Sequence, residues 1–127
     1  HIGANLPAGT MQFTLFVPSC DRDSKPIDQE RWAQESLTIF GTLFRGATAF
    51  PPGRGVWRDD ERGGALVWDE PVMVVCYANP DDVDDDRLAE LRRFLHRMGR
   101  DAKQGEIGIV IDGEYYGISE YDPPEAT

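Results

Sequence analysis

The sequence has few cysteines, few histidines and no long apolar run. Cys20 and Cys76 carry the only thiols in 127 residues, too few for a disulfide scaffold, which favours a cytoplasmic location. His1 and His96 are the only imidazoles, which argues against a zinc site, and no cofactor motif is present. No apolar run approaches the roughly 20 residues of a membrane helix. The sequence therefore predicts no metal, no cofactor and no membrane association.

Basic charge is also scarce, because 13 Lys and Arg face 23 Asp and Glu and leave a net charge of −10. Such a field opposes general binding to DNA, RNA or an anionic membrane. The 40% hydrophobic content can fill a packed core, so the chain is not a disordered acidic tail. A basic protein is the partner that this charge favours.

The length fits one domain. Residues 1–10 contain no acidic or basic residue except His1 and are interpreted as a tag remnant or disordered arm, with Met11 a plausible start. Residues 11–122 are predicted to form the domain. Pro123 and Pro124 open a tail over 123–127.

Hydrophobic spacing predicts two helices. The first follows Asp28, a good N-cap, and ends at Gly46. The second follows the aspartate-rich stretch 81–86, which caps the helix and does not match a calcium loop. Apolar residues recur at spacings of three and four in both, at Ala33, Leu37, Phe40 and Phe44, and at Leu88, Leu91, Leu95, Met98 and Ala102.

Short apolar runs predict the strands. Residues 13–17 form the first strand, and 107–111 pairs with 114–119 around the turn Asp112-Gly113. Residues 47–58 are interpreted as one interrupted strand, paired with a second that joins 66–68 to 72–77 across a bulge at Pro71. The order is β-α-β-β-α-β with an added terminal strand. We expect an α+β, ferredoxin-like domain, with an antiparallel sheet and two helices on one face.

This plan places the end of the first strand, the central hairpin turn and the end of the second helix at one edge of the domain. Carboxylates there are candidates for a metal or general-base role, and the arginines for an anion. The glycine-rich stretch 53–58 is a weak phosphate-loop signal without a following helix. Ordinary loop carboxylates paired with neighbouring arginines are the alternative. The candidate edge comprises Asp21, Asp23, Arg54, Arg58, Glu70 and Arg100.

No complete catalytic constellation is evident, so no catalytic residue is predicted. His96 is flanked by arginines and is expected on the surface, and no serine or cysteine has an evident partnership with it. Cys76 lies in an apolar run and is expected in the core.

Five segments resemble a group of small bacterial proteins of unknown function with a ferredoxin-like domain. The resemblance implies a bacterial cytoplasmic protein and transfers no activity, cofactor or catalytic residue. It covers most of residues 11–121. The segments are 40–49, 55–58 and 94–100, together with 104–106 and 112–116.

Two functions follow as hypotheses. The first is a non-catalytic interaction or regulatory domain that forms a homodimer through a sheet face containing Trp57, Trp68 and Tyr116, or that docks a basic protein. The alternative is a small enzyme or binder that acts on a phosphorylated small molecule or phosphodiester at the Asp21, Asp23, Arg58 and Arg100 edge.

Overall fold

A computed structural model describes residues 2–125, so the parts of the predicted arm and tail at residues 1, 126 and 127 lie outside the described residues. Short 3-10 turns lie at Asp60–Arg62 and Pro80–Asp82. The longer elements are β1 (Met11–Val17), α1 (Gln29–Phe44), β2 (Thr48–Ala49), β3 (Gly55–Asp59), β4 (Ala65–Asp69), β5 (Val72–Ala78), α2 (Asp85–Asp101), β6 (Ile107–Ile111) and β7 (Glu114–Ile118).

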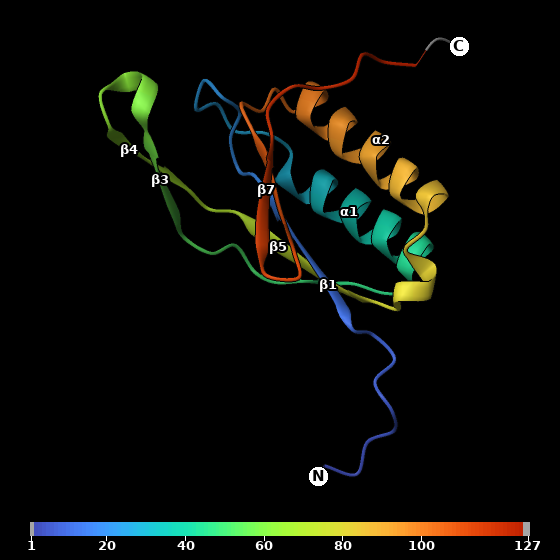
Figure 1. Cartoon of the computed structure of the whole chain (residues 1–127). Coiled ribbons are helices and arrows are strands. Elements are labelled where there is room, and N and C mark those ends of the chain that lie inside the picture. The colour runs from blue at the N-terminus through green and yellow to red at the C-terminus, as the bar shows by residue number, and fades with distance from the viewer. Residues whose placement is uncertain (1, 126–127) are drawn as a thin grey trace.

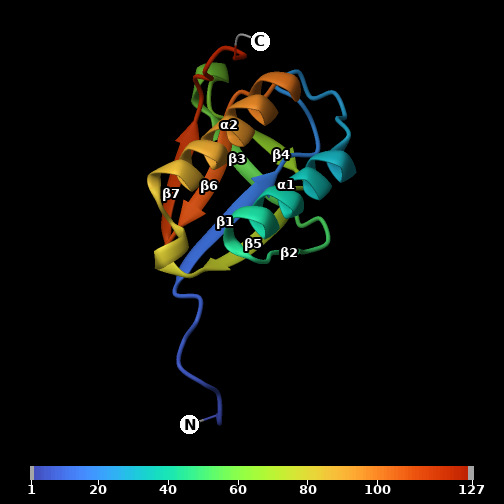
Figure 2. The ribbon, with the colours of Figure 1, turned by 90° about the vertical axis from the view of Figure 1, so that its right-hand side faces the viewer.

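The main sheet is antiparallel, with the strand order β2-β5-β1-β6-β7. Both helices pack on one face of it, and the other face is not covered by a helix (Figures 1 and 2). Leaving β7 aside, this order is that of a ferredoxin-like split βαβ unit, with β7 added at the edge. The α+β, ferredoxin-like prediction is confirmed. No described helix is long and apolar enough to cross a membrane.

The core lies between the sheet and the helices, as strand alternation requires. Phe13, Leu15 and Val17 of β1 point toward the helices and have no exposed surface. The Phe13 ring stacks on Phe44 of α1, with centroids 5.1 Å apart. Cys76 is also buried in this core, as predicted, and burial raises the pKa of its thiol to about 11.

The helix boundaries follow capping chemistry closely. The Asp28 side chain accepts a hydrogen bond from the Arg31 amide at 3.1 Å, and Asp84 accepts one from the Arg87 amide at 2.8 Å. The C-terminal prediction for α1 was wrong by one position. Arg45, with φ of 79°, takes the left-handed conformation expected of Gly46.

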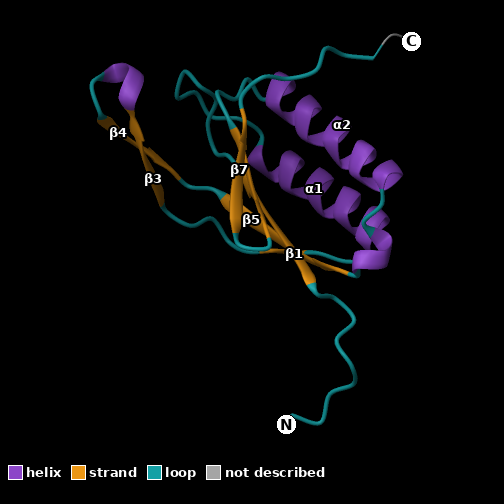
Figure 3. Cartoon of the chain, in the orientation of Figure 1, coloured by secondary structure: helices purple, strands orange, loops and turns teal. Residues whose placement is uncertain are grey.

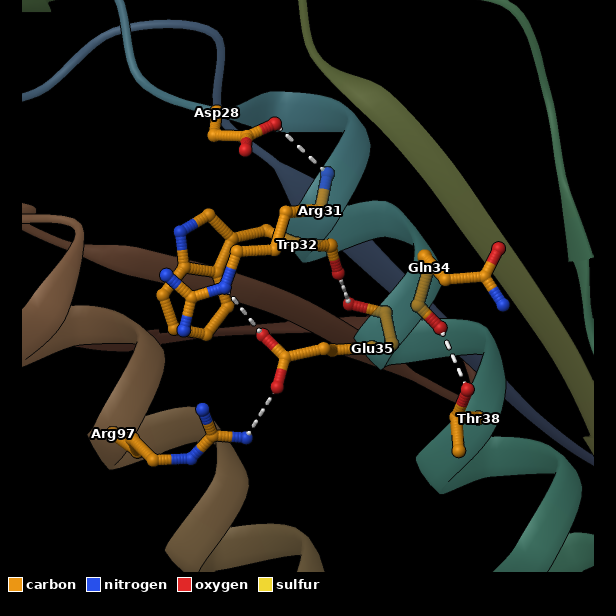
Figure 4. A network of polar contacts seen from close by, with 8 residues as sticks. Asp28, Arg31, Trp32, Gln34, Glu35, Thr38 and Arg97 are labelled. Carbon is orange, nitrogen blue, oxygen red and sulfur yellow. Dashed lines mark hydrogen bonds and ion pairs between the residues drawn. The ribbon is translucent and has the colours of Figure 1, made fainter.

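Glu35 ties the two helices together (Figure 4). Its carboxylate pairs with Arg31 on its own helix and with Arg97 of α2, both at 3.1 Å. Both guanidinium groups also lie over the Trp32 ring, at 4.6 and 5.4 Å from the centroid. This cluster fixes the packing of α1 against α2 on the side away from the sheet.

The predicted central hairpin forms, but it divides into two parts. Thr48 and Ala49 pair with β5 in the main sheet, whereas β3 and β4 pair only with each other as a separate two-stranded sheet. The break falls where Pro51 and Pro71 interrupt the two strands. The β3–β4 hairpin, here called the arm, stands away from the domain on the side opposite the helices (Figures 1 and 3).

The division of the hairpin changes the predicted sheet-face residues. Trp57 and Trp68 belong to the arm and lie on its opposite sides, since Trp57 pairs with Val67 and Trp68 with Val56. Tyr116 pairs with the buried Ile109, so it lies on the helix side of edge strand β7. Tyr115, the preceding residue of β7, lies on the uncovered face, because successive residues of a strand point to opposite faces of the sheet.

The prediction that His96 lies on the surface was wrong. Its side chain is buried against the C-terminal segment, where Nδ1 accepts a hydrogen bond from the Asp122 amide at 2.7 Å. Tyr121 meets the His96 ring edge to face, and Arg92 pairs with the Asp122 carboxylate at 2.7 Å, which lowers the pKa of that carboxyl. The segment after β7 is therefore fastened along α2, and this tertiary contact covers the imidazole.

Candidate functional site

An open cleft of about 430 Å³ lies where β1 ends and the arm begins. Its position follows from the break in the hairpin, because the chain leaves and re-enters the main sheet next to the end of β1. The cleft combines a hydroxyl, a thiol, a guanidinium, an indole and two carboxylates. Its lining residues are Ser19, Cys20, Arg54, Trp68, Asp69 and Glu70.

Hydrogen bonds between Ser19 and Asp69 form the floor of the cleft. The Ser19 hydroxyl donates to Asp69 Oδ1, and the Ser19 amide donates to the same atom at 3.2 Å. The Glu70 amide also donates to Asp69 Oδ1, at 2.8 Å, and to the Ser19 hydroxyl at 3.2 Å. The Asp69 carboxylate is therefore occupied in holding the loop after β1 against the end of β4.

Gln29, at the start of α1, ties the two strands that border the cleft. Its Nε2 donates to the Val17 carbonyl at 3.2 Å and to the Glu70 carbonyl at 2.8 Å. On the arm side, the Gly53 amide donates to the Pro71 carbonyl at 2.9 Å. The backbone on both sides of Glu70 is thus held in place, while its side chain is free to meet a ligand.

Two charged groups in the cleft have no partner. Within residues 2–125, neither the Arg54 guanidinium nor the Glu70 carboxylate forms a side-chain hydrogen bond or ion pair. Trp68 beside them is 63% exposed. With Asp69 and Glu70 against Arg54, the cleft has a net charge of −1 at neutral pH. It is therefore suited to a ligand with an aromatic part, a cationic part and an anionic part.

The predicted edge site forms only in part. Arg54 and Glu70 line the cleft, but Arg58 is on the arm, where it pairs with Asp60 at 2.5 Å. Arg100 is on α2 and donates to the Asp122 carbonyl. The hairpin turn stands apart from the domain because the arm separates from the main sheet, so these arginines do not converge.

The loop after β1 uses Asp21 for its own structure. Asp21 Oδ1 accepts from the amides of Lys25 and Asp23, at 3.0 and 2.8 Å. The hydrogen bond from Lys25 is the main reason why the pKa of the Asp21 carboxyl is lowered. Asp23 is exposed in the same loop and is not part of the cleft lining. Within the described residues, no three histidine, cysteine or acidic side chains come together as metal ligands.

The sequence did not lead us to name Ser19, Cys20 or Asp69 as site residues, although Cys20 follows the first strand at the predicted edge, and it led us to assign Trp68 to a sheet face. The available signal was the pair of breaks at Pro18 and Pro71, which end β1 and precede β5. At each break the chain leaves the main sheet, so polar groups there are not used in strand pairing. Both breaks lie at the same end of the antiparallel pair β1 and β5. That β1 and β5 are neighbours is a property of the sheet order, which local spacing does not specify.

A second groove of about 660 Å³ lies between α1 and α2, but its arginines are already paired. Arg97 pairs with Glu35, Arg93 pairs with Glu90, and Arg100 bonds to the carbonyl of Asp122. A ligand there would have to displace these contacts. The cleft after β1 is the better candidate, because its Arg54 and Glu70 side chains are free of such pairs among the described residues.

Comparisons with protein-family models and with curated proteins gave no match. Two solved structures are similar to this chain. A phage SAM lyase in complex with S-methyl-5'-thioadenosine shares 17% identity and a TM-score of 0.66, over 94% of this chain and 97% of that chain. A phage SAM lyase in the apo state shares 17% identity and a TM-score of 0.60, over 98% and 100%. At this identity the likeness supports the fold alone.

Proposed function

We propose that this protein is a small enzyme that binds and cleaves S-adenosylmethionine in the cleft after β1. The observation that carries the proposal is the unpaired Arg54 and Glu70 beside the exposed ring of Trp68. The similarity of the whole chain to phage SAM lyase supports the choice of ligand.

Each part of S-adenosylmethionine has a complementary group in the cleft. Trp68 offers a face on which the adenine can stack, and Arg54 is a bidentate partner for the methionine carboxylate. Glu70 is a counter-ion for the sulfonium. The ligand has a net charge of +1, which complements the net charge of −1 of the cleft and the −10 of the chain.

The same charges favour this ligand over the phosphorylated molecule predicted from the sequence. A phosphate would meet two carboxylates and a single arginine, since Arg58 and Arg100 lie outside the cleft. Attack of the substrate's own carboxylate oxygen on the γ-carbon of the methionine chain would form the C–O bond of a homoserine lactone as the C–S bond breaks. The sulfur would keep the bonding electron pair and leave as neutral methylthioadenosine. The product would then lose the attraction to Glu70, which favours its release.

The test is to incubate the purified protein with S-adenosylmethionine and to measure methylthioadenosine by chromatography and mass spectrometry. Glu70→Gln and Arg54→Gln should each weaken ligand binding about tenfold or more, because each removes a charge-assisted contact. Glu61→Gln, in the arm turn outside the cleft, is the matched control and should bind as the wild type does.

Three binding outcomes would distinguish the hypotheses. S-adenosylhomocysteine, which lacks the sulfonium charge, should bind less tightly than S-adenosylmethionine. If neither compound binds in calorimetry and inorganic phosphate does, the phosphate-ligand hypothesis is favoured instead. If none of the three binds, the cleft is not the predicted ligand site.

The homodimer predicted from the sequence also remains a proposal. Its support is the exposure of predicted interface aromatics, with Trp57 54% and Trp68 63% exposed. The docking of a basic protein partner, the bacterial origin and the cytoplasmic location stay predictions.

A further inference from the structure

We infer that the arm of one copy of this protein docks on the uncovered sheet face of a second copy. The inference goes beyond the proposed function by naming the two surfaces. It builds on the homodimer proposal. Trp68 belongs both to the cleft and to the docking side of the arm, so ligand binding and docking would share that ring, and the test is made without ligand.

The arm exposes apolar side chains without a partner. Val56, Leu66 and Trp68 lie on one side of it. Val56 pairs with Trp68 across the hairpin, and Leu66 is two residues before Trp68 on β4, so it points to the same side. Leu66 is 59% exposed, and Val56 is about half exposed. An isolated two-stranded hairpin is marginally stable in water, so a projecting arm of this kind needs packing against something else.

The uncovered face of the main sheet is the second apolar surface. Met73 and Tyr77 of β5 point to this face, because the alternate residues of β5 are buried toward the helices. Tyr115 of β7 points the same way. Tyr77 is 62% exposed, so this sheet has one face in the core and one open aromatic face.

The distribution of charge allows the partner to be another copy of this acidic chain. The strands β1, β5 and β6 contain no charged residue, and the arm, residues 55–69, contains two arginines and four acidic residues and so carries only −2 of the net charge. Apart from Glu106, which accepts a hydrogen bond from the Tyr115 hydroxyl, most of the net charge of −10 that would hold two copies apart is therefore located outside both surfaces. These two surfaces can meet at little electrostatic cost.

The exposed aromatic side chains would supply part of the area that a standard dimer interface takes. A standard interface takes about 800 Å² from each partner, about a tenth of the 8580 Å² of this chain. Half-exposed aromatic side chains contribute about 100 Å² each, so Trp68, Tyr77 and Tyr115 with their apolar neighbours form the centre of such an interface. Because the arm and the face are different surfaces, each copy donates one arm and accepts one.

The test uses size-exclusion chromatography with light scattering on the full chain, without ligand. The wild type should be larger than a monomer. Leu66→Glu on the arm and Tyr77→Glu on the face should each be monomeric, whereas Leu88→Glu, at an exposed leucine of α2, should assemble as the wild type does. Val56→Glu is a second arm variant, and circular dichroism must show that every variant is folded.

A mixing experiment separates this inference from other dimers. The Tyr77→Glu copy keeps an intact arm and the Leu66→Glu copy keeps an intact face, so a mixture of the two should form a one-to-one complex. A monomeric wild type overturns the inference. An assembly that is disrupted only by the arm variants, or only by the face variant, also overturns the inference. Such an assembly would pair arm with arm or face with face. Because the readout needs no S-adenosylmethionine, failure of the ligand proposal leaves this result unaffected.

Discussion

The ion pair between Arg45 and Asp82 allows a quantitative test of how α1 is joined to the turn before α2. Arg45 Nε lies 2.9 Å from Asp82 Oδ2, and the two side chains are 81% and 12% exposed. That oxygen is buried and has no well-aligned hydrogen-bond donor among the described residues, so the arginine is what compensates its charge. Arg45 also has a φ of 79°, which strains every residue type except glycine.

Two effects of similar size therefore oppose each other at this position. An ion pair with one exposed partner is worth about 1 kcal/mol, and the left-handed conformation costs a non-glycine residue about 1 kcal/mol. Arg45→Ala removes the pair and keeps the strain, so it should lower the free energy of unfolding by about 1 kcal/mol. Arg45→Gly removes both the pair and the strain and should be nearly neutral.

Urea unfolding followed by circular dichroism measures these differences, with Asp82→Asn as the second background. In that background Arg45→Ala should be neutral, and Arg45→Gly should stabilise the protein by about 1 kcal/mol. If Arg45→Ala costs the same free energy with Asp82 as with Asn at position 82, the two side chains are not coupled and the reasoning fails.

Three further predictions test the core, the C-terminal segment and the open face. Phe13→Ala should reduce the free energy of unfolding by about 3–5 kcal/mol, because a fully buried ring leaves a cavity; a cost below 1 kcal/mol in urea unfolding would contradict the packing. Gly99→Ala brings a methyl within 2.1 Å of the Tyr121 ring, so it should release the segment after β7 and increase hydrogen exchange there, despite the better helix propensity of alanine. Burial, and then the hydrogen bond to Glu106, raises the pKa of Tyr115 to about 12, so its stabilisation is complete below pH 10 and is lost as the pH rises through 12. Tyr115→Phe should remove this step from the ultraviolet tyrosine titration, and an unchanged titration near pH 12 would refute the assignment.

Local patterns in the sequence determined most of the secondary structure. Asp28 was predicted as the N-cap of α1, and the stretch 81–86 that was predicted to cap α2 contains its N-cap, Asp84. An N-cap carboxylate accepts hydrogen bonds from amides two or three residues away, so this contact is local in the sequence. The apolar run 13–17 predicted β1, and Asp112-Gly113 predicted the last hairpin. The order of these elements was sufficient to predict the ferredoxin-like fold.

The site depended on contacts that local spacing does not contain. The predicted edge included Arg54 and Glu70, but it also included Arg58 and Arg100, which the separation of the arm leaves elsewhere. Prolines show where a strand is interrupted, but the direction in which the freed hairpin leaves depends on the packing around the break.

Tertiary packing likewise decided the environment of His96, because its partner lies 26 residues further along the chain. It also set the cleft, where the Ser19 and Asp69 side chains meet across 50 residues. Sequence by itself determined most of the elements and the charge of the chain, since these depend on composition and on neighbours a few residues apart. Only the tertiary structure decided which polar groups meet and which stay unpaired, because that depends on how distant segments come together.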